Sequence, residues 1–287
     1  MSDKPGTLFL CATPIGNLED MTYRAVRILQ QSAVIAAEDT RRTRNLLNHF
    51  AIHTPLVSYH EHNKAGRGPE LIGRLLRGED VAVVSDAGLP GISDPGSDLV
   101  DLAIAAGITV TPLPGANAAL SALVCSGLDT TLFTFIGFLP RTTKKRRELL
   151  AKLAGYPCTM ILYEAPHRLK STLTELRQAF GNRPAVAARE LTKKFEEFLR
   201  GTLESLQEHF AAASPRGEFT LVIAGCPSAP SGELPSQSAA EISPGQAVMA
   251  LVAAGQDKKA AIRAVALARS IPKREVYQAV LLLEQGQ

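Results

Sequence analysis

The sequence has no tryptophan, few aromatic residues of any kind and only four cysteines. Phe and Tyr together make up 5% of the 287 residues, so the sequence shows no base-stacking surface of the kind that binds single-stranded nucleic acids. The cysteines form no CxxC pair; they are Cys11, Cys125, Cys158 and Cys226. Their wide spacing argues against a disulfide framework or a zinc site and favours a reducing, cytoplasmic location. Each lies in or beside an apolar stretch, and we expect four small buried side chains.

Long apolar runs are also missing. No stretch of about 18 uncharged apolar residues occurs, so we expect no membrane-spanning helix. We expect no secretory signal either, because the apolar stretch at residues 7–13 is too short for a signal core with its flanks. Hydrophobic residues still make up 45% of the chain and charged residues 21%, which is typical of a soluble globular protein with a sizeable core.

Short apolar runs alternate with segments of helical periodicity. The runs of the first half are apolar throughout, which favours a parallel sheet with helices on both faces. The predicted strands are 7–13, 33–37, 81–85, 108–110, 132–137, 158–163, 184–189 and 218–224. The predicted helices are 23–31, 42–50, 69–77, 96–106, 148–154, 169–180 and 203–212. We therefore predict an α/β fold with two α/β domains, residues 1–116 and 117–226.

The end of the chain has a different composition. Residues 227–243 are rich in Pro, Ser and Gly, and this composition predicts a flexible linker. Residues 244–287 predict a small helical appendage whose first helix has Ser243 as its N-cap and Pro244 at its first position. The stop and restart at residues 270–273 has the look of a helix-turn-helix. It fits a packing or dimer helix pair and nucleic-acid binding equally well.

The formal net charge is +3, and it is unevenly distributed. Residues 1–116 carry −3, residues 117–226 carry +5 and residues 244–287 carry +3. This distribution fits a polyanionic partner without requiring one. The densest basic run, residues 141–147, is predicted as a protruding arm suited to phosphate contacts, although such runs are most often simply solvated.

Three loops rich in Gly and Pro follow predicted strands, where ligands bind at the carboxyl edge of a parallel sheet. The loop at residues 12–17 contains one glycine and is not a GxGxxG motif, which disfavours a nucleotide-phosphate cradle. The loop at residues 85–96 holds three glycines, two prolines and two aspartates, more than an ordinary turn needs, so we interpret it as a binding loop. The alternative is an elaborate turn in which Asp94 caps a helix. The third loop, residues 112–120, opens a helix toward the same edge.

Two further clusters carry groups for acid–base chemistry. Residues 58–63 contain the pair His60 and His62, but no third ligand is evident, so we predict no metal. Glu190 and Lys193 form the second cluster. Each cluster also fits an ordinary polar surface.

Together these motifs resemble the tetrapyrrole methylase superfamily. The resemblance rests on residues 12–17, 85–96, 114–116 and 218–222. Residues 38–41, 58–63, 137–141 and 163–168 resemble more narrowly one branch of it, the ribose 2′-O-methyltransferases that act on a cytidine in the decoding region of 16S rRNA. Relatives that modify tetrapyrroles have a Gly-Asp-Pro loop where this chain has Ser85-Asp-Ala-Gly88, which favours the RNA branch.

The resemblance implies a homodimer that binds S-adenosylmethionine in a cleft between two α/β domains. The residues it implies for the cofactor are Pro14, Asp86, Pro90, Asn117, Ala118, Tyr163 and Ala224. Because a ribose hydroxyl is a poor nucleophile, a general base would help the transfer. Our candidates for that catalytic role are His60, Glu190 and Lys193. Our candidates for contacts to RNA phosphates are Arg41, Arg42, Arg141, Lys144, Lys145, Arg146, Arg147 and Arg168.

Two other functions stay open. One is a methyltransferase of the same fold that acts on a small molecule such as a tetrapyrrole, and it predicts activity without RNA. The other is a catalytically idle RNA-binding protein of ribosome assembly, and it predicts salt-sensitive RNA affinity without methyl transfer.

Overall fold

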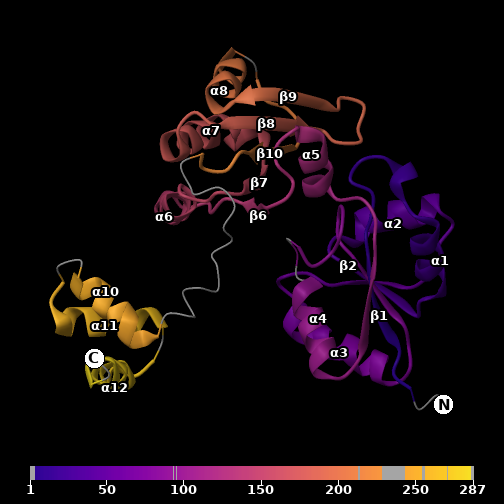
Figure 1. Ribbon diagram of the computed structural model, residues 1–287. Coiled ribbons are helices and arrows are strands. Elements are labelled where there is room, and N and C mark those ends of the chain that lie inside the picture. Colours follow the sequence, from indigo (N-terminus) through magenta and orange to yellow (C-terminus); the bar gives the residue numbers. More distant parts are fainter. Residues whose placement is uncertain are drawn as a thin grey trace. The chain divides into compact units, whose positions relative to one another are not determined.

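The structure is a computed structural model that describes residues 4–92, 94, 96–212, 214–227, 243–253, 256–269 and 271–285. The chain forms two compact units, Met1–Ala229 and Pro230–Gln287, each of which is described by itself (Figure 1). Among the helices of the described residues, none is long and apolar enough to cross a membrane.

The first sheet of unit 1 is parallel throughout, as its uninterrupted apolar strands predict. Its strand order is β3-β2-β4-β1-β5, with all four neighbouring pairs parallel. The strands are β1 (Thr7–Cys11), β2 (Val34–Ala37), β3 (Leu56–Ser58), β4 (Val81–Val84) and β5 (Thr109–Leu113). Because the strands are parallel, all of their carboxyl ends lie at one edge of the sheet.

Helices cover both faces of this sheet. They are α1 (Tyr23–Gln31), α2 (Thr40–His49), α3 (Lys64–Leu76) and α4 (Gly96–Ala105), with a short 3-10 turn, η1, at Leu18–Asp20. Leu29 of α1 and Leu47 of α2 are buried in one apolar cluster with β2 and β4. Leu71 of α3 and Leu99 of α4 are buried in a second cluster on the other face. Figure 1 shows α1 and α2 beside one another and α3 and α4 beside one another.

The second sheet is mixed, with strand order β6-β7-β10-β8-β9. The strands are β6 (Phe133–Phe138), β7 (Thr159–Glu164), β8 (Pro184–Arg189), β9 (Glu197–Thr202) and β10 (Phe219–Ile223). Among neighbouring strands, only β6 and β7 pair in parallel; β10 is antiparallel to both β7 and β8, and β9 is antiparallel to β8. One edge of this sheet therefore carries the carboxyl ends of β6, β7 and β8 together with the amino ends of β9 and β10.

The helices of the second sheet divide unequally between its faces. They are α5 (Ala118–Ser126), α6 (Thr143–Leu153), α7 (Pro166–Phe180) and α8 (Leu203–Ala212). The large apolar cluster of one face takes side chains from α6, α7 and α8. Helix α5 covers the other face, where Ala119, Ala122 and Leu123 are buried against the sheet. The boundary predicted at residue 116 falls between β5 and α5.

Unit 2 contains three described helices, α10 (Pro244–Ala253), α11 (Lys258–Arg269) and α12 (Lys273–Gln285). Val248, Ala261, Val276 and Val280 are buried in its apolar cluster. The Ser243 hydroxyl accepts the N–H of Gln246 at 3.3 Å, as the predicted N-cap requires. Most of the predicted linker, residues 227–243, lies outside the described residues.

Several sequence-based expectations were wrong in detail. Strand β3 was not predicted because it is only three residues long, and β9 was not predicted because polar residues interrupt its apolar pattern. Helix α3 begins at Lys64 and not at Pro69, since a glycine-rich segment obscured its first turns. Residues 143–147 are not part of a protruding arm: they form the first turns of α6, whose Leu150 is buried. The expectation of four buried thiols was also wrong, because Cys125 is exposed.

Candidate functional site

The loops that the sequence singled out all follow strands of the first sheet, and they meet at its carboxyl edge. Residues 58–63 follow β3, residues 38–44 follow β2, residues 85–96 follow β4, residues 12–17 follow β1 and residues 114–118 follow β5. In the order of the sheet these segments lie next to one another. A parallel α/β sheet binds ligands at this edge, which makes the row of loops the candidate site.

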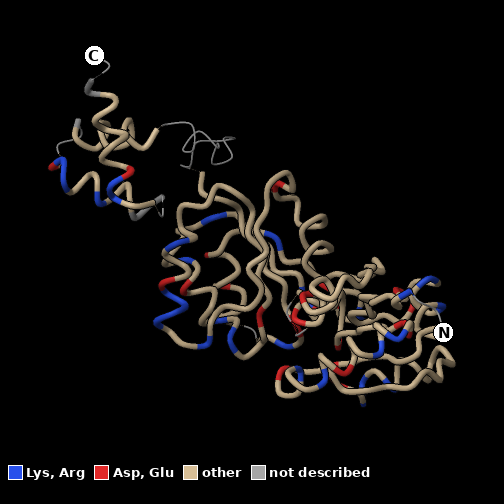
Figure 2. Tube along the Cα trace, turned by 90° about the horizontal axis from the view of Figure 1, so that it is seen from below, with Lys and Arg blue, Asp and Glu red and all other residues tan. Residues whose placement is uncertain are grey.

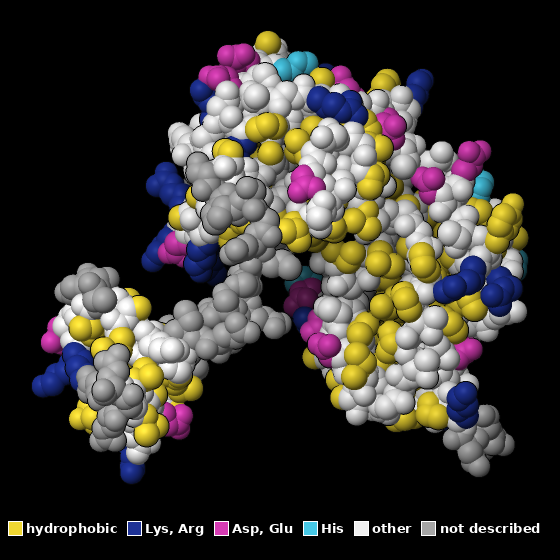
Figure 3. All heavy atoms as spheres, viewed as in Figure 1, with side chains coloured by type: hydrophobic (Ala, Val, Ile, Leu, Met, Phe, Trp, Pro, Cys, Tyr) yellow, Lys and Arg dark blue, Asp and Glu magenta, His cyan; other side chains and the backbone are white. Residues whose placement is uncertain are grey.

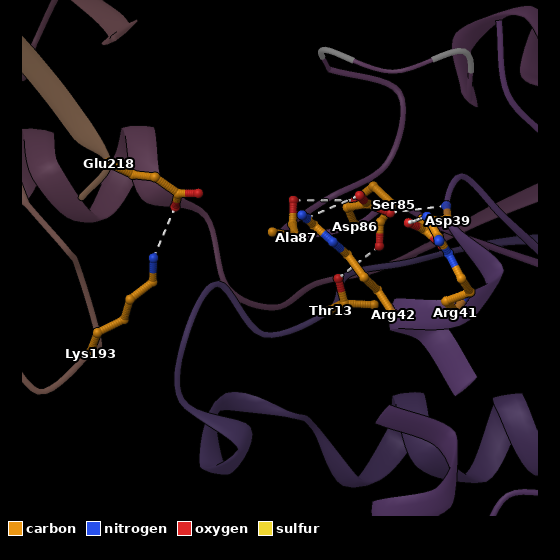
Figure 4. Close-up of polar contacts among 9 residues, drawn as sticks. All are labelled: Thr13, Asp39, Arg41, Arg42, Ser85, Asp86, Ala87, Lys193 and Glu218. Atoms are coloured by element: carbon orange, nitrogen blue, oxygen red, sulfur yellow. Dashed lines mark hydrogen bonds and ion pairs between the residues drawn. The ribbon is translucent and has the colours of Figure 1, made fainter. Parts of the chain in front are cut away.

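Asp86 joins the loops after β2 and β4. Its Oδ1 accepts the backbone N–H of Asp39 at 3.0 Å, and its Oδ2 pairs with Nη1 of Arg42 at 3.2 Å. The Glu38 carboxylate in turn accepts the backbone N–H of Asp86. Figure 4 shows Asp39, Arg42 and Asp86 converging at this point. The two strand ends thus hold each other through reciprocal carboxylate-to-backbone hydrogen bonds.

Negative charge gathers around Glu38. Burial raises the pKa of Glu38, and the negative charges of Asp86 and Asp94 raise it further, against the opposing effects of the Asp86 N–H and of Arg42. Asp94 also accepts the N–H of Gly96 at 2.8 Å, so the predicted helix-capping role is present as well. Three carboxylates at one strand edge, with Arg42 as their counter-charge, suit a ligand that carries positive charge.

The turn after β1 is tied to the loop after β4. Thr13 and Gly88 form an isolated antiparallel bridge, and the Thr13 hydroxyl donates to the carbonyl of Ser85 at 3.2 Å (Figure 4). Pro14 follows directly and is half-buried, while Pro90 of the long loop is buried. The loop after β4 is therefore a fixed structure held from both sides.

Asn117 and Ala118 open α5 beside this turn. The Asn117 side-chain oxygen accepts the N–H of Leu120 at 3.0 Å and caps the helix. The N–H of Ala119 hydrogen-bonds the Tyr163 phenol oxygen. Burial raises the pKa of Tyr163, so the phenol keeps its proton at neutral pH. Tyr163, at the end of β7, thus joins the start of α5 to the second sheet.

Glu190 and Lys193 lie at the edge of the second sheet that carries Tyr163. Lys193 Nζ pairs with Glu190 Oε1 and with Glu218 Oε2, both at 3.0 Å. Figure 4 shows the pair of Lys193 with Glu218. Burial lowers the pKa of Lys193, but its hydrogen bonds to Glu190 and Glu218 outweigh this and raise it overall. Burial likewise raises the pKa of Glu190, but the Glu218 N–H and Lys193 outweigh this and lower it. An ammonium and a carboxylate held so firmly are poorly suited to take up a proton.

The Lys193 segment touches the turn after β1. The Asn17 N–H donates to the Thr192 hydroxyl at 3.1 Å, and a Cβ added to Gly16 would overlap the Lys193 side chain. Thr192 itself has a positive φ of 66°, which is strained for a β-branched residue. The two sheets of unit 1 therefore approach closely where their candidate residues lie.

His60 keeps an unengaged ring nitrogen. Its backbone N–H donates to the Asn63 side chain at 2.9 Å, and Asn63 also donates to the Ser58 hydroxyl at 3.0 Å. The Nδ1 atom of His60 is buried and has no hydrogen-bond partner among the described residues. Of the three predicted bases, His60 is the one whose side chain is not committed to an ion pair.

No group of three or more His, Cys, Asp or Glu side chains within the described residues could hold a metal ion. The site consists of carboxylates, backbone groups and aromatic or small apolar side chains. Comparisons with known proteins identify the family of the chain. The family described as Tetrapyrrole (Corrin/Porphyrin) Methylases matches residues 7–207. The chain belongs to this family.

Named relatives match nearly the whole chain. The chain is 52% identical to a protein named Ribosomal RNA small subunit methyltransferase I from Halalkalibacterium halodurans, covering 96% of this chain and 94% of that protein. It is 49% identical to a protein of the same name from Synechocystis, covering 97% and 99%. The predicted family is confirmed, and so is the prediction of an enzyme, since these relatives are named methyltransferases.

The fold is also that of solved tetrapyrrole methylase structures. The uroporphyrin-III C-methyltransferase from Thermus thermophilus, complexed with S-adenosyl homocysteine, has a TM-score of 0.55 and 18% sequence identity, covering 76% of this chain and 97% of that one. The predicted α/β fold class is confirmed.

Ala224 is the one predicted cofactor residue that the structure places away from the others. Because β10 is antiparallel to β7, Ile223 pairs with Met160, and Phe219 pairs with Glu164. Ala224 therefore lies beside the start of β7, roughly 13 Å along the strand from Tyr163 at about 3.3 Å per residue. It belongs to the opposite edge of the second sheet.

The predicted RNA contacts differ in how far they are exposed. Arg41, Arg42, Arg141, Lys144, Lys145 and Arg147 are exposed, although Arg41 also pairs with Asp39 and Arg42 with Asp86. Arg146 is less available for RNA phosphates, because it makes a bidentate ion pair with Glu175 of α7. Arg168 is held by Glu164 and by the carbonyl of Leu139. These two arginines hold the fold together.

Sequence reasoning missed Glu38 and Glu218 as site residues. Glu38 entered the sequence analysis only within the motif at residues 38–41. Its position directly after the fully buried strand β2 was the signal that could have placed it beside Asp86. Glu218 precedes a strand, and nothing in the sequence tells that β10 runs antiparallel and brings its amino end to the site.

Proposed function

We propose that this chain transfers a methyl group from S-adenosylmethionine to the 2′-hydroxyl of a cytidine in the decoding region of 16S rRNA, as a cytoplasmic homodimer. The observation that carries the proposal is the 52% identity, across 96% of the chain, to a protein named Ribosomal RNA small subunit methyltransferase I. The resemblance of residues 38–41, 58–63, 137–141 and 163–168 to the ribose-modifying branch supplies the target atom and nucleotide.

The residues at the strand edge fit the proposed cofactor. S-adenosylmethionine carries a sulfonium and an ammonium. Burial and then the negative charges of Asp86 and Asp94 raise the pKa of Glu38, so three carboxylates crowd this edge. A bound cation would relieve that repulsion. The residues proposed to hold the cofactor are Pro14, Asp86, Pro90, Asn117, Ala118 and Tyr163; Ala224 drops out because of its position.

The bound cofactor supplies an electrophilic methyl group, and the chain has to align the ribose oxygen and manage its proton. We assign removal of the ribose hydroxyl proton to His60, because among the three candidate bases only its side chain is in no ion pair within the described part of the chain. Asn63 holds the backbone of His60 in place. Lys193 and Glu190 are assigned to positioning, because each is already bound to the other.

The proposed phosphate contacts are the exposed cations, above all Arg141, Lys144 and Lys145 at the start of α6. Figure 2 shows Lys and Arg gathered along this part of the chain. Helix α6 carries them outward because its apolar side packs on the second sheet. Clustered cations of this kind bind phosphates and give affinity that falls with salt.

The test is transfer of labelled methyl from S-adenosylmethionine to small ribosomal subunits isolated from cells that lack this protein. Protein-free 16S rRNA and a tetrapyrrole precursor serve as alternative acceptors. The proposal predicts label in the subunits or the RNA. Label in the tetrapyrrole alone would indicate the small-molecule reaction, and RNA binding without transfer would indicate an assembly protein.

A further inference from the structure

Strand β6 contains an irregularity just before its end. Phe135 pairs with Ile161 and Gly137 pairs with Leu162, so Ile136 has no partner of its own and the register shifts by one residue. Gly137 has φ +70°, a conformation that glycine adopts without strain. Such bulges re-aim the side chains that follow them.

The bulge determines which face of the sheet carries Phe138. In the shifted register Phe138 lies opposite Tyr163; without the extra residue it would lie opposite Glu164, whose side chain belongs to the other face. Residues opposite one another in a sheet share a face, so Phe138 lies with Tyr163 on the face that α5 covers. The bulge thus moves one aromatic ring toward the candidate site.

Phe138 is nevertheless exposed, with 56% of its surface accessible. Its ring centroid is 5.6 Å from that of Tyr163, and Tyr163 is 5.0 Å from Phe135. Phe135 and Tyr163 are partly buried, and Phe138 is the exposed ring of the three. A large apolar ring gains free energy when it is covered, and the exposed Phe138 ring is available to a partner.

Exposed cations follow Phe138 directly. After Leu139 and Pro140 come Arg141, Lys144 and Lys145, and no ion pair to these three is found among the described residues. Arg146 donates to the carbonyls of Pro140 and Arg141 and pairs with Glu175, which fastens the segment onto α7. Figure 3 shows blue side chains gathered on the side of the second sheet where Figure 1 has α6.

We propose that Phe138 is a stacking platform for an unpaired nucleobase of the RNA substrate, while Arg141, Lys144 and Lys145 contact the flanking phosphates. The proposal rests on the proposed function and adds to it the residues that bind single-stranded RNA. Aromatic rings stack on any base, and cations beside a ring hold the backbone. An exposed ring that three exposed cations follow closely in the chain suits a nucleic acid, which offers bases and phosphates together.

The experiment compares Phe138→Leu, which keeps an apolar side chain but removes the aromatic face, with Phe138→Trp, which restores it. Tyr156→Leu is the matched control, since Tyr156 is also a partly exposed aromatic residue (42%) but precedes β7 at the opposite edge. We expect Phe138→Leu to raise KM for small subunits roughly tenfold, with unchanged affinity for S-adenosylmethionine. Phe138→Trp and Tyr156→Leu should keep KM within about twofold of the wild type.

Two results would overturn the inference. One is an unchanged KM for Phe138→Leu. The other is weakened binding of S-adenosylmethionine that accounts for the whole effect, because the ring would then stack on the adenine of the cofactor. If the wild type transfers no methyl to subunits, the proposed function itself has failed. Direct binding of a single-stranded decoding-region RNA then decides the inference: equal affinity of wild type and Phe138→Leu overturns it, and a roughly tenfold loss sustains it.

Discussion

The carboxylate of Asp86 accepts the backbone N–H of Asp39 at 3.0 Å. This bond joins the ends of two adjacent parallel strands. A second bond runs in the opposite direction, since the Glu38 carboxylate accepts the N–H of Asp86. The same Asp86 side chain pairs with Arg42. One residue therefore shapes the loop after β2, fixes the loop after β4 and brings negative charge to the edge where the cofactor is proposed to bind.

Replacing Asp86 by Asn should weaken S-adenosylmethionine binding by roughly ten- to a hundredfold, the value of a charge-assisted hydrogen bond. Asn still accepts the Asp39 N–H, and the partly exposed pair with Arg42 contributes only about 0–1 kcal/mol, so stability should hardly change. Calorimetric titration and thermal unfolding measure the two effects. Asp101→Asn, an exposed change on α4, is the control. Unchanged cofactor affinity in Asp86→Asn would remove Asp86 from the site.

Glu38→Gln should make the folded protein more stable at neutral pH. The pKa of Glu38 is raised in the folded state above its ordinary value of 4.5, so its ionisation costs stability: the contribution is full below the ordinary pKa and is lost as pH rises through the folded-state pKa. Gln never ionises and still accepts the Asp86 N–H. Urea unfolding of both proteins at pH 4 and pH 8 should show the variant's advantage at pH 8 only.

The same change should weaken cofactor binding several-fold, because it removes one of three carboxylates that favour a positive ligand. An advantage in stability that persists at pH 4, or tighter binding of S-adenosylmethionine, would show that Glu38 is not under electrostatic strain in this site.

His60→Ala should lower kcat for methyl transfer by roughly 100-fold or more, the usual effect of a lost general base. Added imidazole should restore part of the rate, which a purely structural role would not allow. His62→Ala is the matched control, since His62 is an exposed neighbour whose ring lies 6.0 Å away. Equal losses in both variants, without rescue by imidazole, would count against His60 as the base.

Arg146 and Lys145 are neighbours in the basic run but should behave in opposite ways. Arg146→Ala leaves the little-exposed Glu175 without its partner and should lower the free energy of unfolding by about 2 kcal/mol. Lys145→Ala should leave stability within about 0.5 kcal/mol, weaken RNA binding and reduce the slope of log affinity against log salt by about one. Urea unfolding and RNA titrations at several salt concentrations test both. A stable Arg146→Ala with lost RNA affinity would reverse these assignments.

The positions of most strands and helices followed from the sequence because apolar side chains dictate them. The uninterrupted runs of β1, β2 and β4 mark strands buried on both faces, and parallel pairing then brings the loops after them to one edge. Strands β3 and β9 lie at the outer edges of their sheets. A strand at an edge pairs on one side only and can be very short, as β3 is, or polar, as β9 is.

The location of the site at the sheet edge followed from the sequence, but the positions of individual side chains at or near the site were harder to predict. The run at residues 141–147 shows no apolar periodicity, yet Arg146 lies one helical turn before the buried Leu150, so a helical interpretation would have put Arg146 on the inner face. The position of Ala224 depended on the direction of β10, which local sequence does not encode. The exposure of Phe138 depended on a bulge that a single glycine marks only weakly.

The measurement that tests the central claim most directly is the chemical identity of the methylated nucleoside. Small subunits from cells lacking this protein are incubated with it and labelled S-adenosylmethionine, and the 16S rRNA is digested to nucleosides and separated. We predict label in 2′-O-methylcytidine alone, mapped to one decoding-region position by its resistance to alkaline cleavage, and none with Asp86→Asn at low cofactor concentration. Label on a base, at scattered positions or in no nucleoside would contradict the account.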